Sequence, residues 1–337
     1  MTSNKDNSAL FNVANNYLEE KEIVVHYERI GKKISFLYPL EEPSPILPPK
    51  WKKTPYPYWT WLGFEISQRI KILNAAWSQS KNLAYFEKAN SIISDICSWS
   101  RWKENDNIRL MIFTADIVSA ISDFINDNFD YLDKKSIKNI TSSLNEKGII
   151  PLYKSLLKIK HYNWNIPLIQ ASALGSCSLI LESKDLGKYS KEIILSRKII
   201  LSDLDRRYKG IDTSSNYRII FNILRHPFRF INNTLGYTEG STYDSFSFDY
   251  ILKFANYVNT FKNDSTLINH NFIREILQYI PAYFSLPGDS NQYAPFDDYE
   301  IGHFDRWSHV LSQINNLPLI SKLHINGIKS NLSNIDK

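Results

Sequence analysis

Apolar residues recur at helical spacing along most of the chain, beginning near residue 60. Successive apolar positions lie three or four residues apart, so they share one face of an α-helix and leave polar positions on the other. The pattern therefore predicts a series of amphipathic helices joined by polar loops. The stripes that define these helices cover residues 62–77, 92–99, 110–124, 137–144, 166–180, 193–204, 246–261, 273–284 and 304–314.

The first 57 residues follow a different pattern. Residues 1–20 predict a loose arm or a short helix. Two short apolar segments, 23–27 and 34–38, flank Gly31 and Lys32, which is typical of a β-hairpin. Six prolines fall within residues 41–57. Because proline lacks a backbone N–H and fixes its own φ angle, this stretch is predicted to be a loop that wraps a surface.

The order of these elements predicts the fold class. Roughly ten helices follow one another without strand alternation, which indicates an all-α fold. No fixed-period repeat is visible, and this argues against solenoids of the tetratricopeptide type. The expected fold is an incomplete α/α toroid built of helical hairpins, with a small N-terminal β-hairpin; a plain helical bundle is the alternative.

Composition narrows the class of protein only modestly. The chain has 337 residues, 43% hydrophobic and 22% charged, as expected of a globular protein with one large domain or two modest ones. Aromatic residues are abundant, with 8 Trp, 20 Tyr and 18 Phe, and their faces suit both core packing and stacking on sugar rings. The formal net charge of +5 mildly favours acidic partners. No run of clustered basic residues is present, so nucleic-acid binding is not expected.

Cysteines and apolar runs bear on cofactors and location. Cys97 and Cys177 both lie within apolar helical patterns, and their spacing suggests neither a disulfide framework nor a metal site. We expect no metal and no cofactor. The first 21 residues lack the apolar core of a signal peptide, and no run approaches the length of a membrane span. The sequence as written predicts a cytoplasmic protein; a truncated N-terminus would fit a periplasmic or secreted one.

Two short polar segments interrupt the helix-forming sequence. Residues 161–165 (His-Tyr-Asn-Trp-Asn) open a helix rich in small residues, and residues 236–243 (Gly-Tyr-Thr-Glu-Gly-Ser-Thr-Tyr) open an aromatic-rich one. The first backbone N–H groups of a helix have no intrahelical partner, so helix starts attract anions. If both openings faced one cleft, they would form a site for a polar, anionic substrate.

These segments resemble those of the heparinase II/III-like polysaccharide lyases. Residues 162–165 and 171–181 are similar to the family's Asn-Asn-Trp-Asn helix opening, and residues 236–243 resemble its Gly-Tyr-x-Glu-Gly-x-x-Tyr segment. The resemblance covers residues 55–310, in order. The other stretches that carry it are residues 59–62 through Arg69 to residues 75–77, Trp99, residues 123–124, Leu132, residues 148–153, 286–289 and 295–298.

The resemblance implies a domain organisation and a partner. Residues 55–314 would form the toroid, with a long central cleft for acidic polysaccharide or oligosaccharide. Residues 1–54 would form the N-terminal arm, hairpin and proline-rich loop, and residues 315–337 a C-terminal tail. Family members usually continue into a β-sandwich region that supplies a further catalytic histidine. This chain ends at Lys337, so we expect an incomplete site; a separate β-sandwich chain that completes it, a shortened gene or a binding-only role would each account for this.

The resemblance also implies a reaction. Lyases of this class cleave uronic-acid chains by β-elimination, in which the C5 proton leaves and the glycosidic oxygen departs from C4. Asn163 would hydrogen-bond the uronate carboxylate and stabilise the charge that develops there. Tyr243 would act as general acid and base. As alternatives, Asn163 is a helix N-cap and Tyr243 a buried tyrosine whose hydroxyl is hydrogen-bonded.

Five further residues are candidates for binding the substrate, and each has a structural alternative. His161 could neutralise charge or act as a base, or it could be an ordinary loop residue. Trp164 could line the sugar cleft or pack between helices. Glu239 could orient a catalytic side chain or stabilise the dipole of its helix. Arg225 and His226 could pair with uronate or sulfate groups, or complement the C-terminal end of a helix.

Three function classes fit the sequence to different degrees. An enzyme, a polysaccharide lyase acting on uronate-containing glycans, is favoured. A non-catalytic glycan-binding or surface-polysaccharide assembly protein would share the fold and the cleft but show no turnover. A glycoside hydrolase on the same architecture ranks last, because it needs two carboxylates facing each other across the cleft and only Glu239 and Asp244 are near candidates.

Overall fold

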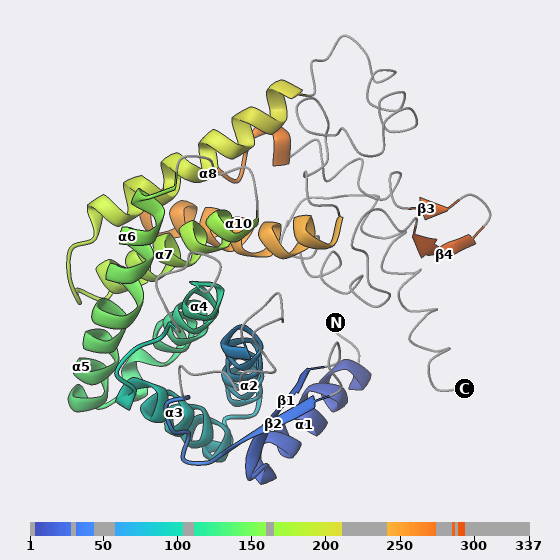
Figure 1. The fold of residues 1–337 in the computed structure, drawn as a ribbon, viewed down its shortest axis with the longest axis vertical. Coiled ribbons are helices and arrows are strands. Elements are labelled where there is room, and N and C mark those ends of the chain that lie inside the picture. The colour runs from blue at the N-terminus through green and yellow to red at the C-terminus, as the bar shows by residue number, and fades with distance from the viewer. Residues whose placement is uncertain are drawn as a thin grey trace. The chain divides into compact units, whose positions relative to one another are not determined.

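The computed structural model is mostly helical, with a small antiparallel hairpin near the N-terminus (Figure 1). It describes residues 4–27, 32–43, 58–103, 111–159, 165–210, 241–273, 285–286 and 289–293. The chain divides into two compact units: Met1–Lys158 with Ala173–Ile193, and Ile159–Ser172 with Ile194–Lys337. The predicted all-α class with its hairpin is confirmed. Closure of the helices into a toroid, and the domain boundaries at residues 54 and 314, stay predictions.

The N-terminal elements are a helix and the predicted hairpin. Helix α1 (Asn4–Glu19) is a regular helix of 16 residues, so the helical alternative holds for this segment. Strands β1 (Glu22–Tyr27) and β2 (Lys32–Leu37) pair antiparallel along their whole length. Ile23 and Val25 are buried, which follows from the alternation of side chains along a strand. The hairpin therefore has one apolar face turned to the core of the first unit.

Three helices build the core of the first unit. They are α2 (Tyr58–Ser80), α3 (Leu83–Ser98) and α4 (Met111–Asn128), and the short 3₁₀-helix η4 (Phe129–Tyr131) follows. Helix α2 packs against both α3 and α4, and α4 is buried on almost every face. The apolar stripes predicted for these helices are confirmed as core, with fully buried side chains that include Leu62, Ile66, Ile70, Leu73, Ile93, Ile117, Ile121 and Phe124.

An aromatic cluster packs α2 against α4. The ring centroids of Trp59 and Phe113 are 5.2 Å apart, and each lies 6.2 Å from that of Trp99. Gly63 permits this approach, because a Cβ atom at that position would lie 2.6 Å from Cδ2 of Phe113. Any side chain at residue 63 would therefore push the two helices apart.

A helical rod follows in which one stretch is wound more widely. It consists of α5 (Lys134–Ser143), the π-helix η5 (Leu144–Ile149) and α6 (Ile150–Leu157), and we call it the α5–α6 rod. A π-helix bonds each residue to the fifth along and is seldom longer than one turn, so it leaves no periodic signal in the sequence. Gly148 lies within it, where a Cβ atom would be 2.5 Å from Cγ2 of Val118.

Three longer helices complete the described fold. They are α7 (Asn165–Ser183), α8 (Ser190–Gly210) and α10 (Ser241–Lys262), and all three coincide with predicted stripes. Among the described residues, α7 is the one helix long and apolar enough to cross a membrane by length and composition. Because 89% of its apolar window is buried inside the protein, α7 is typical of a core helix.

Within the second unit, an ion pair and a histidine–carboxylate contact join α8 to the segment after α10. Nη2 of Arg197 lies 2.7 Å from Oδ2 of Asp264, and Nε2 of His270 lies 3.2 Å from Oδ1 of Asp205. Nδ1 of His270 accepts the backbone N–H of Phe272 at 3.2 Å. These contacts fix the turn that follows α10 against α8.

A second short β pair lies towards the C-terminus. Strands β3 (Ser285–Leu286) and β4 (Asp289–Tyr293) pair antiparallel where the sequence predicted only a loop. A two-residue strand is too short to leave an alternation pattern, so no sequence signal marked it. The helices predicted at residues 273–284 and 304–314 lie outside the described residues, except for residue 273, which is helical.

Candidate functional site

The two polar segments singled out in the sequence each lead directly into a helix. Helix α7 begins at Asn165, immediately after residues 161–164, and α10 begins at Ser241, immediately after residues 236–240. Both helix starts belong to the second unit. The predicted helix openings are therefore confirmed, and each polar segment adjoins the unpaired N–H groups of a helix start.

The side chains expected to carry the chemistry lie outside the described residues. They are His161, Asn163 and Trp164 before α7, and Arg225, His226 and Glu239 before α10. Tyr243 lies in the first turn of α10, where the structure describes the backbone but not the side chain. The distance between the Asn163 amide and the Tyr243 phenol therefore stays a prediction, as do the roles of the other five residues.

Helix α7 carries several buried polar side chains. Gln170 is fully buried and hydrogen-bonded or otherwise paired. The hydroxyls of Ser172, Ser176 and Ser178 are buried without a hydrogen-bond partner among the described residues. Such small side chains let neighbouring elements pack closely around the helix. Helix α7 is therefore typical of a helix packed on all sides.

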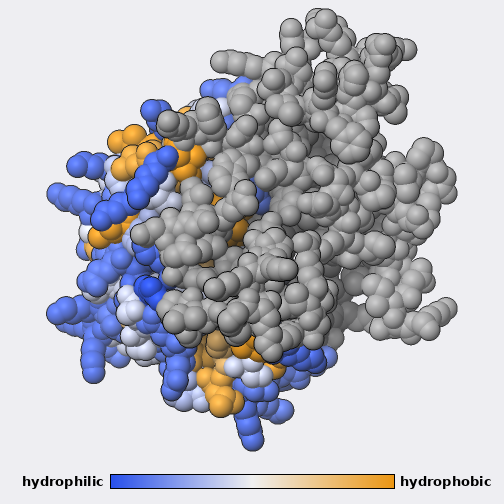
Figure 2. Space-filling model, in the orientation of Figure 1, coloured by the Kyte–Doolittle hydropathy of each residue, from blue (hydrophilic) through white to orange (hydrophobic). Residues whose placement is uncertain are grey.

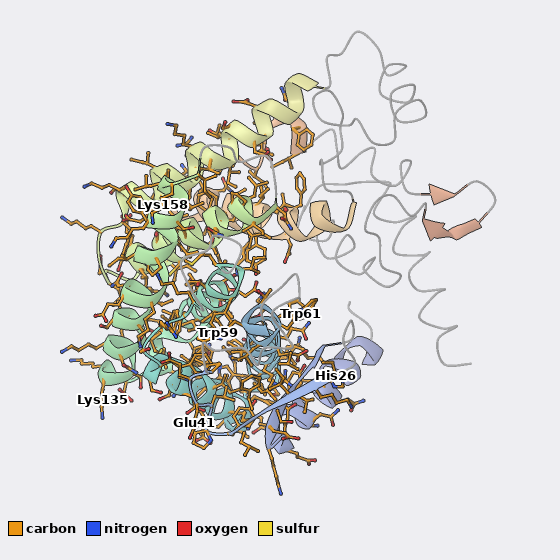
Figure 3. The ribbon with its side chains drawn as sticks, in the orientation of Figure 1. His26, Glu41, Trp59, Trp61, Lys135 and Lys158 are labelled. Atoms are coloured by element: carbon orange, nitrogen blue, oxygen red, sulfur yellow. The ribbon has the colours of Figure 1, made fainter. Side chains whose placement is uncertain are left out.

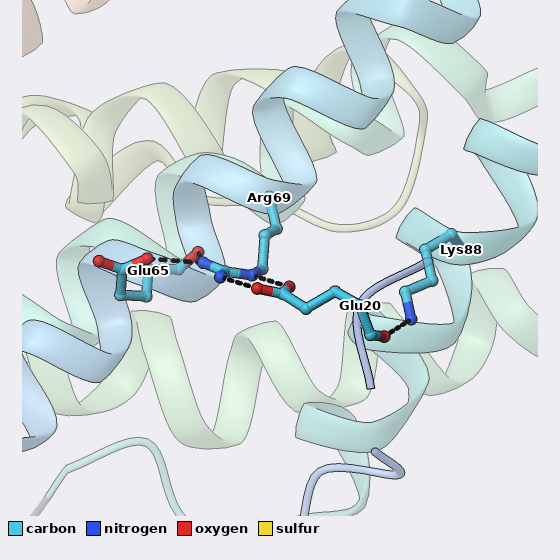
Figure 4. Close-up of polar contacts among 4 residues, drawn as sticks. All are labelled: Glu20, Glu65, Arg69 and Lys88. Atoms are coloured by element: carbon cyan, nitrogen blue, oxygen red, sulfur yellow. Dashed lines mark hydrogen bonds and ion pairs between the residues drawn. The ribbon is translucent and has the colours of Figure 1, made fainter. Parts of the chain in front are cut away.

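A dense charge network surrounds Arg69 on α2 (Figure 4). Its Nε and Nη2 atoms donate to the Glu20 carboxylate at 2.6 and 2.5 Å, and Nη1 donates to Oε2 of Glu65 at 2.6 Å. The Arg69 side chain is 5% exposed. The ring of Tyr17 lies 4.6 Å from the guanidinium carbon, and Nζ of Lys88 donates to the backbone oxygen of Glu20 at 3.3 Å. Two carboxylates, one directly after α1 and one on α2, therefore bind one buried cation.

The same contacts shift the pKa values of the groups involved. Burial alone would lower the pKa of Arg69, but its bonds to Glu20 and Glu65 together raise it above its ordinary value. Burial also raises the pKa of the Tyr17 hydroxyl and lowers the pKa of the Lys88 ammonium group. Arg69 consequently stays cationic across the whole physiological pH range.

This network stabilises the fold and does not form a ligand-binding site. The guanidinium donors of Arg69 already face two carboxylates, so a uronate carboxylate would have to displace one of them. The pairs instead join the end of α1 to α2. In the sequence, Arg69 stood out only as part of the family resemblance. Its position directly before Ile70, within a stripe of buried residues, was the available sign that its side chain is buried.

A second polar cluster joins the C-terminal ends of α2 and α4. The Asn74 amide donates to Asp127 at 2.8 Å, the Asn128 amide donates to Asn74 at 2.6 Å, and the Trp77 indole donates to Asn128 at 2.7 Å. Nζ of Lys81 lies 5.1 Å from the Trp77 ring centroid. Each amide is matched with a partner on the other helix, so this cluster also serves the fold.

Metal-binding and thiol chemistry find little support in the described part of the chain. No group of three or more His, Cys, Asp or Glu side chains is placed there to hold a metal ion. Cys97 and Cys177 are both buried with free thiols, and burial raises the pKa of Cys97 to about 11. Cys97 has neither the lowered pKa nor the exposure that a reactive cysteine requires, and Cys177 lacks the exposure.

Comparison with known proteins adds no relative. The sequence matches no protein-family model, and no curated protein is significantly similar to it. Fold and helix openings therefore define the class: a mostly helical protein in which two polar segments lead into helices whose first residues belong to the same unit.

Proposed function

We propose that this protein binds uronate-containing polysaccharide and cleaves it by β-elimination. The observation that carries the proposal is that both polar segments precede helix starts, at Asn165 and Ser241, within one compact unit. Two helix N-termini offer unpaired N–H groups and the positive ends of two helix dipoles to an anion. The resemblance of the same segments to heparinase II/III-like lyases supports the same substrate class.

The proposed reaction assigns complementary tasks to the two segments. The amide of Asn163 donates to the uronate carboxylate and stabilises the enolate-like charge that develops when the C5 proton leaves. The hydroxyl of Tyr243 takes that proton and returns one to the departing glycosidic oxygen. A neutral amide suits the first task, because it donates hydrogen bonds without competing for the proton.

The remaining candidates would bind the sugar chain around these two residues. Arg225 and His226 would pair with carboxylate or sulfate groups, and Trp164 would stack on a sugar ring. His161 and Glu239 would orient the reacting groups. A helical toroid would supply the cleft.

The test is an elimination assay on the full chain. Each elimination creates a C4=C5 double bond conjugated with the carboxylate, which absorbs in the ultraviolet. Purified protein is incubated with polyuronates and with sulfated glycosaminoglycans, and absorbance is followed over time. Variants Tyr243→Phe and Asn163→Ala should lose at least about a hundredfold in rate, as expected for an acid–base group and a charge-stabilising donor. Glycan affinity should persist in Tyr243→Phe.

Two results would count against the proposal. An unchanged rate in Tyr243→Phe would remove that residue from the mechanism. Glycan binding without absorbance change on any polyuronate, with and without an added β-sandwich chain, would instead favour a non-catalytic glycan-binding or assembly protein.

A further inference from the structure

The α5–α6 rod concentrates the positive charge of the chain. Residues 134–158 contain six lysines and one acidic residue, Glu146, and so carry a net charge of +5. This equals the formal net charge of all 337 residues, so the rest of the chain is balanced between basic and acidic residues. These lysines do not form a run of basic residues in the sequence, because they are spread over 25 positions. The helical rod brings them together.

Five of the six lysines lie on the outer face of the rod. Lys134, Lys135 and Lys138 are exposed at the start of α5, and Lys154 and Lys158 are exposed at the end of α6. Figure 3 shows Lys135 and Lys158 at opposite ends of the rod, and Figure 2 shows hydrophilic surface over α5. The opposite face of the rod is buried and consists of Ile140, Leu144, Gly148, Ile149, Leu152 and Leu156.

The sixth lysine, Lys147, has a structural role. Lys147 is half-buried, and its Nζ donates to the backbone oxygen of Cys97 at 2.5 Å and to the Ser143 hydroxyl at 3.3 Å. It therefore caps the C-terminal end of α3. Within the described part of the chain, Lys134, Lys138, Lys154 and Lys158 make no such contact, and Lys135 only lies near the Asp133 carboxylate.

The position of the first lysine group is unfavourable for the helix itself. Lys134 and Lys135 occupy the first turn of α5, and Lys138 follows in the next. Cations at a helix N-terminus oppose the positive end of the helix dipole. The Asp133 carboxylate, which caps the helix by accepting the Ser136 N–H at 2.7 Å, offsets this only in part. The stability of the helix does not explain three lysines there.

We infer that the outer face of the α5–α6 rod, formed by these five exposed lysines, is a binding surface for a linear acidic polysaccharide. Lys138 and Lys154 are separated by roughly 24 Å of helix, at about 1.5 Å per residue. A flexible polyanion lying along the rod reaches both lysine groups, and its binding is then multivalent. The choice of a glycan among linear polyanions rests on the proposed function, whereas the polyanion surface itself does not.

The exposed face favours a glycan over two other anionic partners. Single-stranded nucleic acid is usually held by aromatic rings on which bases stack, and the one aromatic residue of the rod, Tyr153, is half-buried. An anionic membrane is bound by a broad apolar face flanked by basic residues. Only Ile150 and Leu157 are exposed apolar side chains on the rod, at 46% and 58%. Lysines without exposed aromatic or broad apolar surface match a sulfated or carboxylated sugar chain.

The experiment compares two charge-matched triple variants of the full chain. The first is Lys134→Gln/Lys135→Gln/Lys138→Gln, and glutamine preserves helix propensity. The control, Lys21→Gln/Lys33→Gln/Lys198→Gln, removes three exposed lysines elsewhere. Unchanged circular dichroism and melting temperature verify that both variants fold.

Binding of fluorescently labelled heparin and polygalacturonate is titrated at several salt concentrations. We expect the first triple variant to raise Kd about tenfold or more at low salt and to flatten the dependence of log Kd on log salt, because fewer counterions are released. The control should change Kd less than about twofold under the same conditions.

Three outcomes would overturn the inference. Equal weakening by both triple variants would show that only net charge matters. Tighter, lysine-dependent binding to anionic vesicles or to single-stranded DNA than to either glycan would assign the surface to another partner. An unchanged Kd in the first variant would show that these lysines do not bind the glycan. Lysine-dependent glycan binding without any elimination would defeat the proposed function and leave this inference standing.

Discussion

Arg69 and Glu20 form a two-point ion pair across 49 residues of sequence, with Nε to Oε2 at 2.6 Å and Nη2 to Oε1 at 2.5 Å. Glu20 directly follows α1, and Arg69 lies in the middle of α2. The guanidinium is almost fully buried, and among the described residues the carboxylates that compensate its charge are Glu20 and Glu65, the latter on its own helix. The pair therefore couples the order of the N-terminal segment to the stability of the helical core.

Removing one member of this pair should be costly. We expect Glu20→Gln to lower the free energy of unfolding by about 2–4 kcal/mol, because it leaves a buried cation short of a partner. The matched control is Glu42→Gln, since Glu42 pairs with the half-buried Arg101 at 3.4 Å and accepts exposed hydrogen bonds from Ser100; this variant should lose less than about 1 kcal/mol. Urea unfolding measures both free energies. Equal losses would mean that the Glu20–Arg69 pair contributes no more to stability than the Glu42–Arg101 pair.

The close approach of α2 and α4 gives a second prediction. Gly63→Ala should lower the free energy of unfolding by about 1–3 kcal/mol, because the added methyl group meets the ring and backbone of Phe113. Gln79→Ala, on an exposed position of the same helix, should change it by less than about 0.5 kcal/mol. A Gly63→Ala protein as stable as the parent would indicate that the helices are further apart than described.

The buried thiols predict low chemical reactivity. Burial raises the pKa of Cys97 to about 11 from an ordinary value of 9.0, so the thiolate fraction near neutral pH falls about a hundredfold. We expect iodoacetamide at mildly alkaline pH to leave Cys97 and Cys177 unmodified in the native protein and to modify both in urea. Mass spectrometry of the digested protein gives the result, and rapid native modification of Cys97 would be inconsistent with the packing around it.

Asp95 predicts a specific dependence of stability on pH. Burial raises the pKa of its carboxyl, and the Leu40 N–H and the Lys88 ammonium lower it only in part. A raised folded-state pKa gives stability that is fully present below the unfolded pKa and is lost as pH rises through the folded pKa. Asp95→Asn keeps an oxygen that can accept the Leu40 N–H but cannot ionise.

The melting temperature of Asp95→Asn relative to the parent should therefore increase as pH rises from about 4 to about 7. A pH-matched series of thermal melts on both proteins gives this difference directly. A difference that falls over the same range would reverse the sign of the argument and show that the ionised carboxylate stabilises the fold.

Periodicity in the sequence predicted most of the described helices and the hairpin. The stripes over α2, α4, α7 and α10 are long, and their core positions are buried as expected. The π-helix η5 was missed because its wider winding adds no hydrophobic repeat, and β3 because two residues cannot alternate. Element type is therefore recoverable from the pattern where a segment makes several turns of one geometry.

Contacts between distant residues were beyond the sequence pattern. Nothing local to Glu20 indicates that it pairs with Arg69, and nothing in the spacing of Lys135 and Lys158 marks a common surface until a helix joins them. The candidate site was predicted from two helix openings, and both are confirmed as helix starts. The meeting of Asn163 with Tyr243 depends on tertiary packing, and it stays a prediction.

The most direct test of the central claim is a distance measurement between positions 163 and 243. Spin labels are attached to Asn163→Cys/Tyr243→Cys, while the native thiols, Cys97 and Cys177, are buried and unreactive. The account predicts one narrow distance distribution below about 20 Å, the combined reach of two side chains and a sugar ring. A longer distance, with the labels on separate faces of the molecule, would contradict it.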